Sequence, residues 1–462
     1  MPFSKDFSWG AATAAYQIEG AHDADGKTPS VWDRMVRWPG KIHLGENGDV
    51  ACDHYNRLEE DLDLMAEIGL KGYRFSFAWT RILPEGTGSI NEAGLAFYDR
   101  LIDGLLERGI QPWGTLFHWC YPVALYAKGG WLNPESSDWF REYSAVVAKH
   151  YGDRIQNWMT LNEPQMFINL GHDIGVHAPG LKLPPSDLAR CVHNVLLAHG
   201  KSVQAIREHA SLKPRIGWAP ALGVSAVDPE YASDPEVVQH AKEGQFHFNP
   251  DGNFIANGSS IWCDPVFLKK YPDGFVERFE AQLPKSWEAD LEMIAAPIDF
   301  CGMNVYAAWG QHTRDADGNL SYRHENTYGE GFPRTFFGWP VTPEALYWGP
   351  KFFSERYNTP IVITENGMSA HDWVSLDGQV HDPQRIDFTA RYLTELKRAA
   401  SEGVDVRGYF HWSLMDNFEW AEGYKQRFGL IHIDYATQKR TLKDSAKWYR
   451  TVIESNGASL DA

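Results

Sequence analysis

Short apolar runs alternate with amphipathic stretches along this chain, and that alternation constrains its fold more than any other feature. Eight runs have the length and composition of buried strands: Ser8 to Thr13, Gly72 to Trp79, Gln111 to Trp119, Asn157 to Leu161, Arg215 to Pro220, Asp299 to Tyr306, Pro360 to Thr364 and Val406 to Leu414. Between them lie stretches with apolar residues at helical spacing: Arg57 to Ile68, Ala93 to Arg108, Ser137 to Tyr151, Asp187 to His209 and Gln384 to Glu402. Eight strands alternating with helices predict an α/β fold, a parallel sheet closed into a (β/α)8 TIM barrel.

The whole chain, residues 1–462, is expected to form one domain, because barrels of this class often run long and no linker, repeat or low-complexity tract interrupts the pattern. The alternation loosens at 220–299 and 307–359, where Gly, Pro, Asp and aromatic residues are mixed. We expect elaborated loops there, after the fifth and sixth strands, on the C-terminal face of the barrel. Such loops would form the walls of a deep pocket.

Composition narrows the class of ligand and the cellular compartment. The formal charge is −18, which disfavours nucleic acid and anionic membranes as partners. The start of the chain has neither the basic residues nor the apolar core of a secretory signal, and no apolar run is long enough to cross a bilayer. The five cysteines are widely spaced and include no CxxC pair, so free thiols in a cytoplasmic protein are expected.

Two short glutamate motifs, each at the end of a strand candidate, point to the chemistry. They are Thr160-Leu161-Asn162-Glu163-Pro164 and Ile363-Thr364-Glu365-Asn366-Gly367. Taken singly, the first could be a helix start and the second a turn. Together they suit cleavage of a glycosidic bond, which needs one carboxyl to protonate the leaving oxygen and another to attack or stabilise the anomeric carbon.

Other polar and aromatic residues fall at the same strand ends. Amides, imidazole, carboxylate and indole can share hydrogen bonds and apolar contacts with a neutral polyhydroxylated ligand. The candidates are Gln17, His118, Trp119, Asn162, Asn304, Tyr306, Trp412, Glu419 and Trp420. The histidines lack HExxH spacing and Cys/His clusters, so neither a metal nor an organic cofactor is expected.

These segments resemble those of the family 1 glycoside hydrolases, the retaining β-glucosidase and β-galactosidase group. The motifs stand in the family's order from Phe7 to about Tyr449: Phe7-Ser8-Trp9-Gly10-Ala11-Ala12-Thr13-Ala14-Ala15-Tyr16-Gln17-Ile18-Glu19-Gly20, Tyr73-Arg74-Phe75-Ser76, Trp79-Thr80-Arg81-Ile82, His118-Trp119, the two glutamate motifs, and Trp412-Ser413-Leu414-Met415-Asp416-Asn417-Phe418-Glu419-Trp420. The resemblance implies a (β/α)8 barrel with Glu163 as acid/base and Glu365 as nucleophile. It also implies an exo-acting enzyme that removes terminal β-D-glucosyl residues, with β-D-galactosyl or β-D-fucosyl residues tolerated.

The resemblance further implies how the other residues act. Arg74 and Tyr306 are expected to keep the pKa of Glu365 low. The sugar hydroxyls would be held by Gln17, His118, Asn162, Glu419 and Trp420, over a floor formed by Trp412. Trp339 and the segment Gln165 to His177, with Met166, Phe167 and His172, would line the leaving-group site. Trp119, Asn304 and Phe428 complete the expected substrate-binding set.

Two departures and three alternatives accompany this interpretation. Cys120-Tyr121 stands where the family usually shows Asp-Leu, and Val305 replaces the more usual tyrosine before Tyr306. A 6-phosphorylated sugar is disfavoured, because Glu419 would repel the phosphate. A transglycosylase and a catalytically silent carbohydrate-binding barrel remain alternatives to a hydrolase of small β-glycosides or short oligosaccharides. The sequence does not indicate the oligomeric state.

Overall fold

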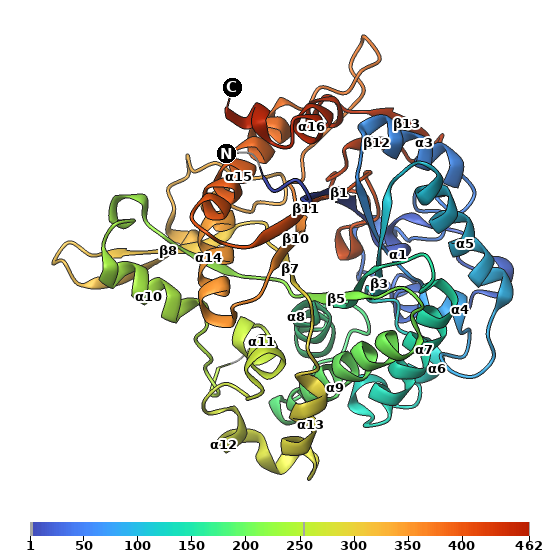
Figure 1. The fold of residues 1–462 in the computed structure, drawn as a ribbon, viewed down its shortest axis with the longest axis horizontal. Coiled ribbons are helices and arrows are strands. Elements are labelled where there is room, and N and C mark those ends of the chain that lie inside the picture. Colours follow the sequence, from blue (N-terminus) through green and yellow to red (C-terminus); the bar gives the residue numbers. More distant parts are fainter. Residues whose placement is uncertain (1–2, 253–254, 462) are drawn as a thin grey trace.

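A computed structural model describes residues 3–252 and 255–461, and at its centre is an eight-stranded parallel sheet (Figure 1). Its strands are β1 (Ser8–Ala12), β2 (Gly72–Ser76), β3 (Gln111–Phe117), β4 (Asn157–Asn162), β5 (Arg215–Ala219), β7 (Cys301–Asn304), β10 (Ile361–Asn366) and β11 (Val406–Trp412). Their order in space follows their order in the chain, and β1 pairs with β11. The predicted (β/α)8 fold is confirmed.

The barrel closes between β5 and β7 through a few backbone contacts. Asn304 donates its N–H to the carbonyl of Pro220 at 3.1 Å, and Leu222 donates to the carbonyl of Asn304 at 3.0 Å. At the other end of the seam, the N–H of Ile216 donates to the side chain of Asp299 at 2.8 Å. Closure brings the carboxyl ends of all eight strands to one rim, where barrel enzymes place their active sites.

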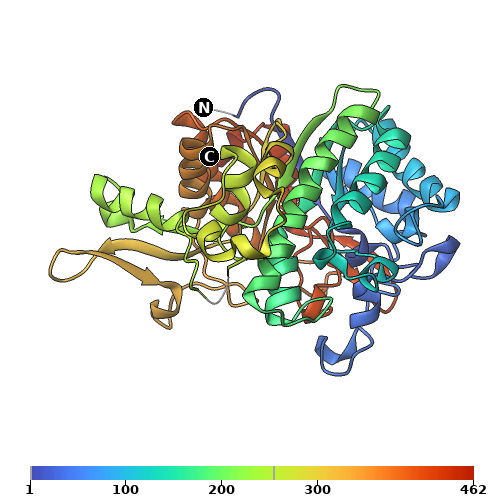
Figure 2. The ribbon, with the colours of Figure 1, turned by 90° about the horizontal axis from the view of Figure 1, so that it is seen from below.

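One helix in each of the seven connections between barrel strands packs outside the barrel, and a further helix follows the last strand (Figures 1 and 2). They are α3 (Leu58–Ile68), α5 (Glu92–Glu107), α7 (Ser136–Tyr151), α9 (Pro185–His209), α13 (Trp287–Ile294), α14 (Ala345–Tyr357), α15 (Pro383–Ser401) and α16 (Asp444–Glu454). The five predicted helical stretches correspond to α3, α5, α7, α9 and α15. The apolar face of each helix packs on the sheet, as its periodicity predicts.

Large aromatic rings fill the barrel opposite the active-site rim. Phe410 packs against Trp113 with ring centroids 4.9 Å apart, and Phe300 lies 5.6 Å from the same indole. Gly10 makes room for this layer, because a Cβ at that position would lie 2.4 Å from the Phe410 ring. Side chains therefore fill the barrel interior at this end, and the barrel is open only at the carboxyl ends of its strands.

The stretches 220–299 and 307–359 are more ordered than the expected loops. They contain a second sheet of β6 (Val224–Val227), β8 (Ala308–Arg314) and β9 (Leu320–His324), together with α10 (Pro235–Gln245), α11 (Ser259–Leu268) and α12 (Phe275–Phe279). Figure 2 shows α10 and the β8–β9 hairpin projecting from one side of the barrel. Strand β6 from the first stretch pairs with β8 from the second. Because the two strands are far apart in the chain, the sequence around either strand does not predict this pairing.

Shorter elements complete the rim. They are α1 (Ala15–Ile18), α2 (Val31–Met35), α4 (Trp79–Ile82), α6 (Val123–Tyr126), α8 (Pro164–Ile168), a π-helical turn η4 (Asn169–Ile174), and the hairpin of β12 (Ile431–Asp434) and β13 (Lys439–Leu442). Trp79, predicted to end the second strand, instead begins α4. Across the described ranges, no helix is both long and apolar enough to span a membrane.

Candidate active site

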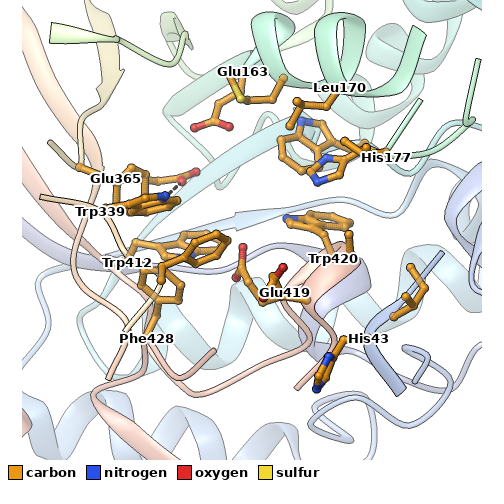
Figure 3. A pocket seen from close by; sticks show the side chains of 18 of the residues that line it. His43, Glu163, Leu170, His177, Trp339, Glu365, Trp412, Glu419, Trp420 and Phe428 are labelled. Carbon is orange, nitrogen blue, oxygen red and sulfur yellow. Dashed lines mark hydrogen bonds between the residues drawn. The ribbon is translucent and has the colours of Figure 1, made fainter. Parts of the chain in front are cut away.

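A cavity of about 840 Å³ opens at the carboxyl ends of the barrel strands. Figure 3 shows Glu163, Glu365 and Glu419 around it, with Trp412 and Trp420 among the surrounding rings. Ten of the predicted site residues line this cavity: His118, Trp119, Glu163, Tyr306, Trp339, Glu365, Trp412, Glu419, Trp420 and Phe428. Gln17, Arg74, Asn162 and Asn304 are buried and bonded to residues at the cavity surface.

Glu163 lies at the junction of β4 and α8, where the chain turns sharply. Its φ of 47° is in the left-handed region, which is uncommon for a residue with a side chain, and Pro164 then begins the helix. Asn304 donates to Glu163 Oε1 at 2.8 Å. Burial, together with the negative charge of Glu365, raises the pKa of Glu163 to about 8. Glu163 is therefore suited to hold a proton at neutral pH.

Glu365 lies within β10 and accepts hydrogen bonds from a guanidinium and from a phenol hydroxyl. Arg74 Nη1 donates to Oε1 at 2.5 Å, and the hydroxyl of Tyr306 donates to Oε2 at 2.7 Å. Burial raises the pKa of Glu365 above its usual value, while Arg74 and Tyr306 act to lower it. The expectation of a low pKa is thus wrong in its net direction, because desolvation outweighs both donors. Since only Glu365 has an ion-pair partner, it is the better candidate of the two to be ionised.

Asn162 connects the two glutamates to His118. Its Oδ1 accepts from Arg74 Nη2 at 2.5 Å and from Asn304 Nδ2 at 3.0 Å, and its Nδ2 lies 3.0 Å from His118 Nε2. Burial and the nearby Arg74 charge lower the pKa of His118, so the ring is neutral and Nε2 can accept from Asn162. The remaining nitrogen, Nδ1, is buried and has no partner among the described residues, which leaves it free for a ligand.

Gln17 holds the third carboxylate of the cavity. Its Nε2 donates to Glu419 Oε2 at 3.2 Å and to the carbonyl of Phe418 at 2.9 Å, whereas its buried Oε1 has no partner in the described part of the chain. Burial and the charge of Glu365 raise the pKa of Glu419 to about 8. Gln17, His118 and Glu419 therefore provide unused donors and acceptors for hydroxyl groups.

Aromatic rings form the cavity walls. Trp119 and Trp420 lie with ring centroids 4.5 Å apart, and the rings of His118 and Trp412 are roughly parallel at 5.8 Å. On another wall, Trp339 stacks against Phe337 at 4.4 Å. Flat apolar surfaces beside hydrogen-bonding groups suit a sugar ring, whose faces are apolar and whose edges carry hydroxyls.

The outer part of the cavity includes several residues that the sequence did not identify. They are Gly40, Lys41, Ile42, His43, Trp309, Phe337, Ala421 and Glu422. Trp309 belongs to β8, and Ala421 and Glu422 follow the Glu419-Trp420 motif directly. The others lie in segments without a motif that approach the rim only in the folded chain. Within the predicted segment Gln165 to His177, Met166 lines the cavity with Leu170, Val176 and His177, whereas Phe167 and His172 pack behind it.

Neither the histidines nor the cysteines form a metal site in the described ranges. No group of three or more His, Cys, Asp or Glu side chains that could hold a metal ion occurs there. Cys52, Cys120, Cys191, Cys263 and Cys301 are each buried and unpaired.

Comparisons with known proteins agree with this geometry. Beta-glucosidase A of Thermotoga maritima is 44% identical over 460 residues that cover 98% of each chain. The bifunctional beta-D-glucosidase/beta-D-fucosidase of Bifidobacterium breve is 38% identical over 481 residues, 99% of each. The solved structure of beta-glucosidase from Thermotoga maritima in complex with glucoimidazole superposes with a TM-score of 0.87 at 44% identity, covering 99% of both chains.

The family described as Glycosyl hydrolase family 1 matches residues 1–458, nearly the whole chain. This match and the two curated relatives confirm the resemblance inferred from the motifs. The chain belongs to glycosyl hydrolase family 1 and is a glycoside hydrolase.

Proposed function

We propose that this protein is a retaining, exo-acting β-glucosidase. The observation that carries the proposal is the unequal environment of the two buried glutamates. Glu365 contacts Arg74 and Tyr306, whereas Glu163 accepts a hydrogen bond from the amide of Asn304 and has its pKa raised to about 8 by burial and the charge of Glu365. Two carboxyls with opposite protonation at one cavity are what double displacement at an anomeric carbon requires.

In the first step, Glu365 attacks the anomeric carbon while Glu163 transfers its proton to the leaving oxygen. This yields a covalent glycosyl-enzyme and leaves Glu163 as a carboxylate. Glu163 then takes a proton from a water molecule, which displaces Glu365 and releases the sugar with its anomeric configuration retained. Arg74 and Tyr306 position Glu365 for attack and stabilise it again as the leaving carboxylate.

The sugar is held by polar groups that have no partner among residues 3–252 and 255–461, and by the aromatic walls. Gln17 Oε1 and His118 Nδ1 are such groups, and Glu419 lies beside Gln17. We propose that Asn162, which precedes Glu163, bonds the 2-hydroxyl, an interaction that strengthens in the transition state. Trp412 forms the floor, and Trp420 packs against Trp119 in a wall. Trp119, Asn304, Trp339 and Phe428 complete the site.

The relatives support glucose as the main sugar and fucose as a tolerated one. Both curated relatives bear the name β-glucosidase, and the Bifidobacterium breve enzyme also bears the name β-fucosidase. We therefore propose small β-glucosides or short oligosaccharides as substrates, with some activity on β-fucosides. The bonded state of both glutamates argues against a silent binding protein. A transglycosylase would use the same two groups, and product analysis with a sugar acceptor separates it from a hydrolase.

We further propose that residues 1–462 act as one catalytic domain in the cytoplasm. The first part is supported by β6 and β8, which join the two long insertions, and by cavity residues that come from both halves of the chain. The second is supported by five buried, unpaired cysteines, which suit a reducing compartment.

The test is Glu365→Gly assayed with 4-nitrophenyl β-glucoside. Turnover should disappear and should return when azide is added, with α-glucosyl azide as the product, because a small anion can attack from the side that the carboxylate occupied. Glu344→Gln, a change at a largely buried glutamate in the second insertion, serves as a control that keeps normal hydrolysis. Full hydrolytic activity in Glu365→Gly would refute the assignment.

A further inference from the structure

Six charged residues form a network behind the cavity wall, and none of them lines the cavity. They are Asp372, Asp382, Asp416, Arg385, Arg427 and Lys443, three acids balanced by three bases. Five of the six are buried, and the side chain of Arg427 is 18% exposed. They come from four parts of the sequence: the loop after β10, the start of α15, the loop after β11, and the residue before α16.

Arg385 joins the end of the nucleophile strand to the loop after β11. Its Nη1 donates to the carbonyl of Met368, which follows Glu365 by three residues, and to the carbonyl of Phe428 at 3.3 Å. Phe428 lies on the cavity wall, with its ring centroid 6.2 Å from that of Tyr306. One guanidinium therefore sets the spacing between the chain that carries Glu365 and the chain that carries Phe428.

Asp416 closes the base of the loop 416–429. Its Oδ2 accepts from Arg427 Nη1 at 2.7 Å, and its Oδ1 accepts from the N–H of Gly429 at 3.0 Å. Lys443 donates to Asp416 at 2.7 Å and to Asp372 at 2.6 Å, so it ties this loop to the loop after β10. Glu419 and Trp420 lie within the loop that Asp416 closes.

A contribution to folding stability is not a sufficient explanation for this buried network. Buried ion pairs recover little more than the cost of removing their charges from water, and apolar residues of the same size often serve as well. A network of fixed charges can, however, define one geometry where an apolar cluster would allow several. Arg385 of this network donates to the backbone carbonyls of Met368, Arg427 and Phe428. These carbonyls belong to the two chain segments whose relative position shapes the cavity.

We propose that this network positions the sugar-binding loop relative to the nucleophile, with Arg385, Asp416 and Arg427 as its main positioning residues. The inference rests on the proposed function, since it assumes that the loop 416–429 binds the sugar through Glu419 and Trp420. It assigns a role in substrate selection to residues that touch neither the substrate nor the two catalytic glutamates. The network acts through the placement of the loop.

The experiment compares Arg427→Gln with wild type on 4-nitrophenyl β-glucoside and 4-nitrophenyl β-xyloside, which lacks the hydroxymethyl group. Displacing a loop by a fraction of an ångström should lower kcat/KM for the glucoside about tenfold or more. The xyloside should lose less, because it has fewer hydroxyls for the loop to hold. The ratio of the two kcat/KM values should therefore fall, a change that a smaller folded fraction cannot produce.

Two other variants and a control make the comparison decisive. Asp416→Asn keeps the shape of the side chain and removes its charge. Arg385→Lys keeps the positive charge and removes the planar guanidinium with its several donors. Either variant can replace Arg427→Gln if that variant does not fold. Arg356→Gln is the control, because Arg356 pairs at 2.7 Å with the buried Asp264 between α14 and α11, away from the cavity lining. It should lower the melting temperature and leave the substrate ratio unchanged.

The outcomes separate the two proposals. If wild type turns over neither glycoside, the proposed function fails. If wild type is active and the folded network variants keep both the rate on the glucoside and the substrate ratio of wild type, the positioning role alone is refuted. A drop in the ratio in Arg356→Gln equal to that in the network variants would also refute it, since any buried ion pair would then have the same effect.

Discussion

Replacing Tyr306 by phenylalanine removes one hydroxyl from the cavity and keeps the ring in place. The ring packs between Trp339 and Phe428, with centroid distances of 5.1 and 6.2 Å, so the substitution creates little space. What is lost is the 2.7 Å hydrogen bond to Glu365 Oε2. Arg74 remains bonded to the other carboxylate oxygen and keeps the nucleophile attached at one side.

The size of the effect follows from the charge on the acceptor. A hydrogen bond to a charged group is worth about 1.5 to 3 kcal/mol. Because Tyr306 acts to lower the pKa of Glu365, its removal should raise that pKa. The same loss of orientation and ionised fraction should reduce kcat/KM near neutral pH about tenfold or more.

The assay is the pH dependence of kcat/KM for 4-nitrophenyl β-glucoside. Its acidic limb reports the carboxyl that must be ionised in the free enzyme, so the limb should move to higher pH in Tyr306→Phe. Tyr73→Phe is the matched control, because its buried hydroxyl bonds Thr13 at 2.6 Å, outside the cavity. That variant should lose about 1 kcal/mol of stability and keep the wild-type profile.

The reasoning about Tyr306 would be refuted by an acidic limb that stays in place while kcat/KM remains within about twofold of wild type. An equal shift of the limb in Tyr73→Phe would also count against it. In that case the effect would come from general loosening of the barrel, and the lost contact to Glu365 would not explain it.

Three further predictions concern the other carboxyls. Glu163→Ala should form the glycosyl-enzyme from 2,4-dinitrophenyl β-glucoside and then stall, since a good leaving group needs no acid but the water still needs a base; mass spectrometry that never detects the adduct would contradict that role. The pKa of Glu163 is raised from 4.5 to about 8, so the folded state binds more protons between those values and stability should fall as pH rises through this window, by at most about 5 kcal/mol. Glu163→Gln should flatten that fall in melts at pH 5 and pH 8, and an unchanged slope would show that another group causes it. Finally, 4-nitrophenyl 6-phospho-β-glucoside should react at least about 100-fold more slowly than its parent, because the phosphate would be buried beside the Glu419 carboxyl, which cannot balance its charge; comparable rates would place the 6-position elsewhere.

Most of the barrel could be predicted from local patterns in the sequence. Strands such as Asn157–Asn162 are short and buried on both faces, and helices such as Pro185–His209 have one apolar face, so each pattern identifies its element. Strand ends were less certain, as at Trp79, because an apolar run does not show where pairing stops. The sheet of β6, β8 and β9 was not predicted, because its pairing joins two insertions far apart in the chain.

The charge network illustrates a second kind of limit. Asp372, Arg385 and Lys443 read singly as ordinary surface charges, and their separation in the sequence hides their pairing. The folded chain buries them and bonds both bases to Asp372, with Lys443 at 2.6 Å. Removing a charged side chain from water costs free energy unless an opposite charge or a hydrogen bond compensates it. Whether such a side chain is buried is decided by the tertiary structure.

By itself, the sequence determined which residue types meet at the rim, because parallel strands in a barrel bring their carboxyl ends together and the motifs stand at those ends. It therefore predicted the family, the barrel, and the cavity around Glu163 and Glu365. The resemblance assigned Arg74 and Tyr306 to Glu365, but only the tertiary structure decided how burial and neighbouring charges act on each glutamate, and it overturned the low pKa expected for Glu365. Their side chains are identical, so the difference comes from their neighbours: an arginine and a tyrosine at Glu365, and an amide and the charge of Glu365 at Glu163. A pKa depends on desolvation and on nearby charges, which are set by distances in space.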